Sequence, residues 1–327
     1  MTSLLEVSDL TVEFRTSRGW SVAVDGVDLS LTPGRTLAVL GESGSGKSAT
    51  ARAIMGVLPA QVGRVGRGRV VLDGQDLLQL SAEQRRTVRG ARVGMVFQDA
   101  LSALNPVLPV GYQIGEGCRV HLGMSRRAAR RRALELLDQV GIPDATRRID
   151  DYPHQFSGGM RQRVMIATAL AADPEILIAD EPTTALDVTV QAQILQLLAT
   201  LQADRQMSLM LITHDMGVVA GMADDILVMY AGRVVEQGPA DDVFERPAHP
   251  YTRALLDSIC TADRKGLPLR VISGQPPDLG NLPSGCAFRT RCSQAADVCK
   301  TFPPVAAVST VHDAVHHAAC HFAGGAG

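Results

Sequence analysis

Residues 41 to 48, Gly-Glu-Ser-Gly-Ser-Gly-Lys-Ser, have the types and spacing of a loop that binds phosphate. Glycine allows the tight bends that turn successive backbone N–H groups toward one anion. Lys47 is expected to reach the β- and γ-phosphates of a nucleotide, and Ser48 to offer its hydroxyl to Mg²⁺. The predicted nucleotide-binding residues of this loop are Gly41, Glu42, Ser43, Gly44, Ser45, Gly46, Lys47, Ser48 and Ala49.

The elements on either side of this loop suit the same chemistry. Residues 36–40 are a short apolar run after the turn-forming pair Pro33-Gly34, which predicts a buried parallel strand. A helix is expected from Ala49 to about Val57, with its positive end facing the phosphates. The alternative, a glycine-rich turn with an incidental lysine, explains neither the strand before the loop nor the helix after it.

A second apolar run, residues 176–181, ends in two carboxylates. Asp180 could hold Mg²⁺ through water, and Glu181 could polarise an attacking water molecule. A core strand entering a loop would account for the run, but not for two carboxylates in a chain with a phosphate loop. Before this strand, Ser157, Gly158 and Gly159 open a helix whose N-terminus offers further N–H donors to a phosphate.

The order of these motifs resembles that of the nucleotide-binding subunits of ATP-binding cassette (ABC) transporters. The resemblance implies that Gln98, after the expected strand 93–97, contacts Mg²⁺ and the attacking water and senses the transmembrane partner. Asp187 closes the stretch Thr-Ala-Leu-Asp, which resembles the D-loop. His214, after the expected strand 209–213, resembles the histidine that contacts the γ-phosphate, although a lone histidine is more often structural.

Two further positions follow from the same resemblance. Phe14 stands where the family has an aromatic side chain that stacks on adenine, but it could equally belong to the core, and Trp20 lies nearby. Residues 157–159 correspond to the signature that contacts the ATP of a partner subunit. Phe156 and Met160 depart from the usual Leu-Ser-Gly-Gly-Gln, yet the three phosphate-contacting residues are present, so the site is expected to work.

The resemblance also implies the fold class and the domains. We expect an α/β P-loop NTPase cassette with a RecA-like core, an antiparallel β edge and a helical subdomain, followed by a small cysteine-rich extension. The cassette is predicted over residues 1–238, its helical subdomain over about 98–159, and the extension over 239–327. A hairpin of residues 226–230 and 233–237 is expected to close the cassette.

Composition excludes some other classes. The chain has 327 residues, of which 46% are hydrophobic and 20% charged, so it can bury a large core. A net charge of −2 leaves no electrostatic footprint for nucleic acid. The basic run 126–132 is followed by regularly spaced apolar residues, which predicts a solvated helix face. No apolar segment approaches the roughly 18 residues of a membrane span, so we expect a soluble intracellular protein.

Two segments resemble the peptide-importer branch of the family. Residues 99–106 are similar to a stretch that follows the Gln98 position there and faces the coupling helix of the permease. Residues 249–256, His-Pro-Tyr-Thr-Arg-Ala-Leu-Leu, resemble the tail segment of oligopeptide, dipeptide and nickel importer ATPases.

Four cysteines follow, with five, six and twenty residues between successive members: Cys286, Cys292, Cys299 and Cys320. Disulfides are disfavoured in a cytosolic protein, so a metal site is predicted. The spacing fits neither common zinc sites nor bacterial ferredoxins. Resemblance to the importer tails favours a [4Fe-4S] cluster, with zinc as the alternative. Cys118 and Cys260 are interpreted as buried or free thiols, and the histidines at 312, 316, 317 and 321 as surface or packing residues.

The sequence is therefore identified as an ATPase subunit that powers an ABC importer for di- or oligopeptides. Its implied partners are a second ATPase, expected to be a paralogue, two permease subunits that hold it at the cytoplasmic face of the membrane, and an extracytoplasmic solute-binding protein. Nickel or another small solute, a homodimer of cassettes, and a redox-regulatory soluble ATPase remain alternatives. The cysteine site is expected to be structural, so that nucleotide binding at Lys47 survives its loss.

Overall fold

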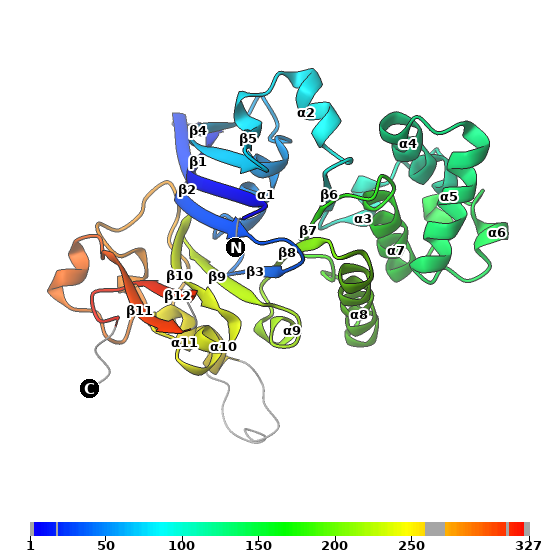
Figure 1. The fold of residues 1–327 in the computed structure, drawn as a ribbon. Coiled ribbons are helices and arrows are strands. Elements are labelled where there is room, and N and C mark those ends of the chain that lie inside the picture. The colour runs from blue at the N-terminus through cyan, green and yellow to red at the C-terminus, as the bar shows by residue number, and fades with distance from the viewer. Residues whose placement is uncertain (1–2, 18, 259–271, 312–313, 324–327) are drawn as a thin grey trace. The chain divides into compact units, whose positions relative to one another are not determined.

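The computed structural model describes residues 3–17, 19–258, 272–311 and 314–323 (Figure 1). The chain divides into two compact units. Unit 1 comprises Met1–Leu31, Thr36–Asp76 and Thr213–Gly327, and unit 2 comprises Thr32–Arg35 and Leu77–Ile212. None of the described helices is long and apolar enough to cross a membrane.

Unit 1 contains an antiparallel sheet with the strand order β2-β1-β4-β5. Its strands are β1 (Leu5–Thr16), β2 (Gly19–Leu31), β4 (Gly63–Leu72) and β5 (Gln75–Asp76). Side chains that alternate along β1 and β2 are buried, including Leu5, Val24 and Leu31. This alternation gives the sheet one apolar face, as expected for a sheet with one side packed on the core.

The second set of strands in unit 1 begins with β3 (Thr36–Leu40), which pairs in parallel with β9 (Asp225–Tyr230). All residues of β3 are buried. β10 (Arg233–Pro239) pairs antiparallel with β9. β12 (Ala314–Ala319) pairs with β10, and β11 (Val305–Val311) pairs with β12, so the red hairpin of Figure 1 extends this edge. The helices of this unit are α1 (Lys47–Met55), α9 (Met216–Val219), α10 (Ala240–Glu245) and α11 (Pro250–Asp257), with 3₁₀ turns η4 (Ala287–Thr290) and η5 (Asp297–Lys300).

Unit 2 contains three parallel strands in the order β8-β7-β6. These are β6 (Val93–Val96), β7 (Ile176–Asp180) and β8 (Ser208–Thr213), whose last residue falls in unit 1. The long helices are α4 (Val110–Leu122), α5 (Arg126–Gln139), α7 (Gly158–Ala169) and α8 (Val188–Arg205). The shorter ones are η1 (Leu77–Gln79), α2 (Ala82–Val88), α3 (Ala100–Ala103), α6 (Ala145–Arg148) and η2 (Pro153–Gln155).

Helix α5 carries the basic run, and the predicted solvated face is confirmed. Ser125 caps the helix by accepting a hydrogen bond from the Ala128 N–H. Four side chains at helical spacing are buried, namely Ala129, Ala133, Leu136 and Leu137. Most of the arginines are exposed, because they lie on the opposite face.

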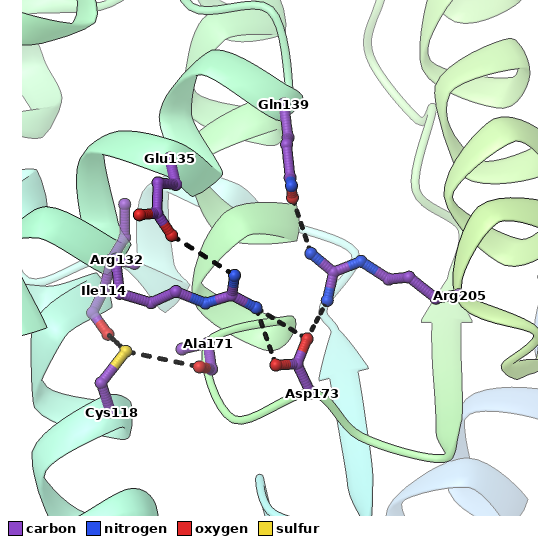
Figure 2. Close-up of polar contacts among 8 residues, drawn as sticks. All are labelled: Ile114, Cys118, Arg132, Glu135, Gln139, Ala171, Asp173 and Arg205. Carbon is purple, nitrogen blue, oxygen red and sulfur yellow. Dashed lines mark hydrogen bonds and ion pairs between the residues drawn. The ribbon is translucent and has the colours of Figure 1, made fainter. Parts of the chain in front are cut away.

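Arg132 is an arginine of α5 that turns inward, and Figure 2 shows its contacts. Asp173 accepts hydrogen bonds from Arg132 at 2.7 and 2.8 Å and another from Arg205 at the end of α8. Arg205 also donates to Gln139 of α5 at 2.6 Å. These contacts join α5, the connection between α7 and β7, and the end of α8.

Several element boundaries differ from the sequence-based expectations. α1 begins at Lys47 rather than at residue 49, and β7 ends at Asp180, so Glu181 is the first residue beyond the strand. The hairpin of β11 and β12 was not expected, since its alanines and histidines show no apolar alternation. A buried pair between His316 and Glu236 of β10 holds it, with Nε2 to Oε1 at 2.7 Å.

The domain boundary at residue 238 stays a prediction. In the division into two compact units, residues 239–327 fall in unit 1, together with the antiparallel sheet.

Candidate nucleotide site and cysteine-rich tail

The phosphate loop joins β3 to α1. Gly41 has φ 149°, and a Cβ there would lie 2.3 Å from the Met229 carbonyl oxygen, so only glycine fits. Ser43 and Gly44 at the tip of the loop are exposed. Within the described residues, the buried Ser45 hydroxyl has no hydrogen-bond partner. The loop therefore offers an open tip and an unsatisfied hydroxyl to a ligand.

Lys47 lies against the base of this loop. Its side chain is buried, and Nζ donates to the carbonyl oxygens of Gly41 at 2.7 Å and Glu42 at 2.9 Å. The ammonium group is thus held directly beside the loop backbone at the N-terminus of α1. This arrangement favours an anion at the loop, as the helix dipole and the ammonium charge act in the same direction.

The two carboxylates of unit 2 stand at the end of β7. Asp180 is fully buried, and Glu181 follows it in the left-handed region with φ 46°. Glu181 Oε2 accepts hydrogen bonds from Gln98 Nε2 at 3.0 Å and from Thr184 Oγ1 at 2.9 Å. The structure thus brings together Gln98 and Glu181, which the sequence assigned to one reaction. Sequence analysis placed Thr184 at the start of the D-loop stretch but did not predict that its hydroxyl contacts Glu181.

The signature and the D-loop both begin helices of unit 2. Ser157 caps α7 by accepting from the Met160 N–H at 3.3 Å, and Asp187 caps α8 by accepting from the Val190 N–H at 3.0 Å. A Cβ at Gly159 would lie 2.6 Å from a methyl carbon of Val190, so close packing between the two helices requires this glycine.

Some residues of the signature region are exposed, and others are packed in the core. Ser157 and Gly158 are exposed, whereas Phe156 is 2% exposed. Phe156, which stands where the family usually has leucine, is thus a packing residue of the core.

The other two sequence-predicted residues lie in unit 1. His214 is exposed and follows β8 directly, before the short helix α9. Phe14 is half-buried in β1, where its ring would be 3.0 Å from a Cβ at Gly63 of β4. The phosphate loop belongs to this unit as well, whereas Gln98, Asp180, Glu181, Asp187 and the signature belong to unit 2.

The four predicted cysteine ligands of the tail border one small pocket, namely Cys286, Cys292, Cys299 and Cys320. All four are free thiols. Burial is the main cause that raises the pKa of Cys286 and of Cys292, and the neighbouring thiols raise both further. Gly285 has φ 72°, and a Cβ there would lie 2.4 Å from the Lys300 carbonyl carbon. Close approach of the two cysteine segments therefore requires this glycine.

The arrangement of these thiols tests the predicted metal. In the described part of the chain, no group of three or more His, Cys, Asp or Glu residues is placed to hold a metal ion. The metal site and its [4Fe-4S] cluster therefore stay predictions.

The other cysteines and the histidines can be placed in part. Cys118 is buried in α4, as predicted, and His316 is a packing residue on Glu236. His321 borders the cysteine pocket, and its Nε2 lies 3.2 Å from the Thr301 carbonyl oxygen. Cys260 and His312 lie outside the described residues.

Tail residues also contact the phosphate loop, which sequence analysis missed. Tyr251 of α11 accepts a hydrogen bond from the Glu42 N–H at 2.8 Å. Arg291, next to Cys292, donates to both carboxylate oxygens of Glu42 at 2.5 and 3.0 Å. No local sequence pattern predicts contacts between residues so far apart in the chain.

A buried strand, a glycine-rich phosphate loop and a helix that begins at its lysine define a P-loop nucleotide-binding protein. Two family models match this chain: that of the ABC transporter over residues 24–184, and that of the C-terminal region of oligopeptide/dipeptide transporters over residues 235–299.

Individual proteins and a solved structure of this family are also similar to the chain. A Brucella abortus (strain 2308) protein named as a peptide import ATP-binding protein is 53% identical over 302 residues, covering 92% of this chain and 91% of the relative. The oligopeptide transport ATP-binding protein OppD of Bacillus subtilis is 51% identical over 314 residues, covering 95% and 88%. The dimeric ATP-binding cassette MJ0796, solved with ADP and Pi, has a TM-score of 0.65 at 29% identity, covering 72% of this chain and 98% of that one.

The chain therefore belongs to the ATP-binding proteins of ABC transporters, in the oligopeptide/dipeptide family. The predicted cassette fold, with its antiparallel β subdomain and helical region, is confirmed. The chain is an ABC ATPase, which couples ATP hydrolysis to transport and uses ATP with Mg²⁺. Proteins of this class dimerise and pair with permeases.

Proposed function

We propose that this chain powers the import of di- or oligopeptides across the cytoplasmic membrane. The observation that carries the proposal is the tail, because residues 235–299 match the C-terminal region of oligopeptide/dipeptide transporters. Two relatives that align with 92% and 95% of this chain are named for peptide import and for oligopeptide transport. Nickel or another small solute is the alternative, because solute contacts belong to the permease and the binding protein.

In the proposed hydrolysis, each residue keeps the role that the family implies for its motif. Lys47 and His214 stabilise the negative charge that develops on the γ-phosphate, and Phe14 stacks on the adenine. Ser48, Gln98 and Asp180 would hold Mg²⁺, which would neutralise phosphate charge. Glu181 orients and polarises the water that attacks the γ-phosphorus, while the bond to the β-phosphate oxygen breaks and ADP leaves.

The orientation of Glu181 supports this role. Gln98 and Thr184 both donate to one of its carboxylate oxygens, which fixes the plane of the carboxylate. A base that is already oriented needs less reorganisation in the transition state.

We further propose that the signature, in which Ser157 and Gly158 are exposed and Gly159 follows, completes the ATP site of a second cassette, and that this partner is a paralogue. Two permease subunits would hold the pair at the cytoplasmic face of the membrane, and an extracytoplasmic binding protein would deliver the solute.

Solute uptake tests the proposed function directly. A strain that lacks this chain should lose uptake of labelled di- or oligopeptides and regain it when the chain is supplied. Cells that supply Lys47→Ala instead should stay deficient. Normal peptide uptake in the deletion strain, with a loss of ⁶³Ni²⁺ uptake, would favour the nickel alternative.

For the tail we propose that Cys286, Cys292, Cys299 and Cys320 hold one [4Fe-4S] cluster. The support is that all four free thiols border one pocket. Four thiolates are the usual ligand number for such a cluster. When bound, the cluster would cross-link segments with few regular elements of their own.

Anaerobic purification tests this cluster. The protein should be brown and contain iron and labile sulfide in nearly equal amounts. Cys299→Ser should lose both, whereas Cys118→Ser, a buried thiol of unit 2, should keep them. A colourless protein with stoichiometric zinc would contradict the cluster, and a metal-free protein with full transport would contradict any metal site.

A further inference from the structure

Glu42 in the phosphate loop is held by two residues of the C-terminal tail. The Glu42 N–H donates to the Tyr251 hydroxyl at 2.8 Å. Its carboxylate receives two hydrogen bonds from Arg291, from Nη1 at 2.5 Å and from Nη2 at 3.0 Å. The tail thus contacts the same loop residue through both its backbone and its side chain.

The same residue is also joined to the lysine of the loop. The Glu42 carbonyl oxygen accepts a hydrogen bond from Lys47 Nζ at 2.9 Å. A displacement of Glu42 would therefore move a contact of the ammonium group that is expected to bind phosphate. The hydrogen bonds of Arg291 and Tyr251 to the loop go to Glu42, so we expect them to act on the lysine through Glu42.

Burial makes the ion pair with Arg291 a specific contact. The Arg291 side chain is 3% exposed and that of Glu42 is 25% exposed. Arg291 also donates to the Ser273 and Ile272 carbonyl oxygens and to the Tyr230 hydroxyl. Its guanidinium is held in one orientation, and a bidentate pair of this kind is strong and directional.

The segment that carries Arg291 is anchored by the cysteine region. Arg291 immediately precedes Cys292, and Phe288 lies between Cys286 and Arg291. The Phe288 ring packs against Tyr230 and Tyr251, with centroids 5.2 and 5.3 Å apart. Cys286 and Cys292 pack against the same buried cluster. The position of Arg291 thus depends on the order of residues 286–292.

We propose that the cysteine-rich tail is a brace for the phosphate loop, with Arg291 and Tyr251 as positioning residues for nucleotide binding. They hold Glu42, Glu42 holds Lys47, and the order of segment 286–292 sets how firmly the loop is held. Nucleotide affinity at Lys47 then depends on the cysteine site, contrary to the expectation from sequence that it survives loss of that site. The positioning role of Arg291 and Tyr251 depends only on nucleotide binding at the phosphate loop. The dependence of nucleotide affinity on the cysteine segment rests on the proposed metal site.

The first test measures the equilibrium binding of ATP to the full chain and hydrogen exchange of amides 41–48. Arg291→Gln should weaken ATP binding about tenfold and speed exchange in the loop, and Tyr251→Phe should do so by about threefold. In the assembled transporter, Arg291→Gln should raise the KM for ATP and leave kcat nearly unchanged, since it does not touch the reacting atoms.

Arg289→Gln is the matched control. Arg289 lies two residues away in the same segment and donates to Ser284 instead of the loop. Its ATP affinity should stay within about twofold of the original chain. If Arg291→Gln bound ATP with the same affinity as Arg289→Gln, the proposal would be overturned.

A variant on the loop side covers the case in which Arg291→Gln unfolds the tail. Glu42→Gln removes the charge of the pair and leaves the tail sequence intact. If the pair is what positions the loop, the double variant should lose about as much affinity as one single variant. Additive losses would overturn the proposal.

Cys292→Ser tests the dependence on the cysteine segment, with iron and sulfide measured on the same sample. Cys292→Ser should weaken ATP binding, and adding it to Arg291→Gln should weaken binding little further. A Cys292→Ser protein without iron but with full ATP affinity would overturn the cysteine part. The absence of iron in the unchanged chain would instead contradict the proposed cluster, while the Arg291 result still decides the brace.

Discussion

Glu181 shows how single residues of this chain are prepared for chemistry. It stands one residue beyond a buried strand in a left-handed conformation, and two neighbouring donors fix its carboxylate. Lys47, by contrast, is held by the backbone of its own loop. The two residues should therefore contribute to different steps, one to hydrolysis and the other to nucleotide binding.

Glu181→Gln should abolish hydrolysis and preserve ATP binding, because the amide cannot polarise the water but keeps the shape of the side chain. Lys47→Ala should weaken ATP binding itself. Steady-state ATPase rates and equilibrium binding separate the two outcomes. Glu175→Gln, at the other end of the same strand, is the control and should keep near-normal rates. A Glu181→Gln rate within about tenfold of the original, a barrier change of about 1.4 kcal/mol, would contradict the assigned role.

Cys118 should behave as an inert thiol. It is fully buried, its Sγ lies 3.3 Å from the Ala171 carbonyl oxygen, and burial raises its pKa. Alkylation requires an accessible thiolate. Iodoacetamide at pH 8 should leave Cys118 unmodified in the folded chain and label it in urea, as read by mass spectrometry of its peptide. Equal labelling with and without urea would show that α4 does not protect it.

At the scale of elements, unit 2 joins three segments through Asp173. Two arginines, from α5 and from the end of α8, converge on this one carboxylate (Figure 2). Both arginine side chains are less than one-fifth exposed, whereas Asp173 is 56% exposed. The carboxylate thus satisfies two guanidinium groups that the helices have largely removed from water.

Asp173→Asn should lower the free energy of unfolding by about 1–2 kcal/mol, because it removes the charge that pairs with two desolvated arginines. Asparagine tolerates the left-handed backbone at this position, where φ is 54°, so the turn itself should persist. Urea unfolding measures the loss. Asp204→Asn is the control, because Asp204 lines one pocket with Asp173 and both arginines, and the structure records no ion pair for it within the described residues. A similar loss in both variants would mean that the ion pairs contribute nothing specific.

At the scale of the whole molecule, the chain carries one phosphate loop and one signature. Residues 24–184 match a single ABC transporter model. In the proposed mechanism, each ATP needs the signature of another subunit. A single chain would therefore carry the phosphate loop of one ATP site and the signature of another, and neither site would be complete.

The isolated subunit should show little ATPase activity and gain it with a partner cassette on the permeases. The measurement is steady-state hydrolysis by the subunit alone, with its paralogue, and with permeases and solute added. Ser157→Arg should block stimulation while leaving ATP binding to the same chain intact, since the signature acts on the partner's nucleotide. Full solute-stimulated hydrolysis by this chain with its permeases alone would contradict the heterodimer.

The phosphate loop, the strands at 36–40 and 176–180, and the basic helix face at 126–132 were predictable from sequence. Their signals are local: glycine spacing, short apolar runs and helical periodicity depend on neighbouring residues. The family resemblance then supplied the candidate roles of Gln98, His214 and the four cysteines.

Tertiary structure decided which distant residues meet. Residues 42 and 291 are 249 positions apart, and residues 42 and 251 are 209 apart, yet they form one contact set. The hairpin of β11 and β12 is held by a buried partner on β10 rather than by its own pattern. Such contacts depend on how the packed core orients whole segments, and no period within the sequence encodes that orientation.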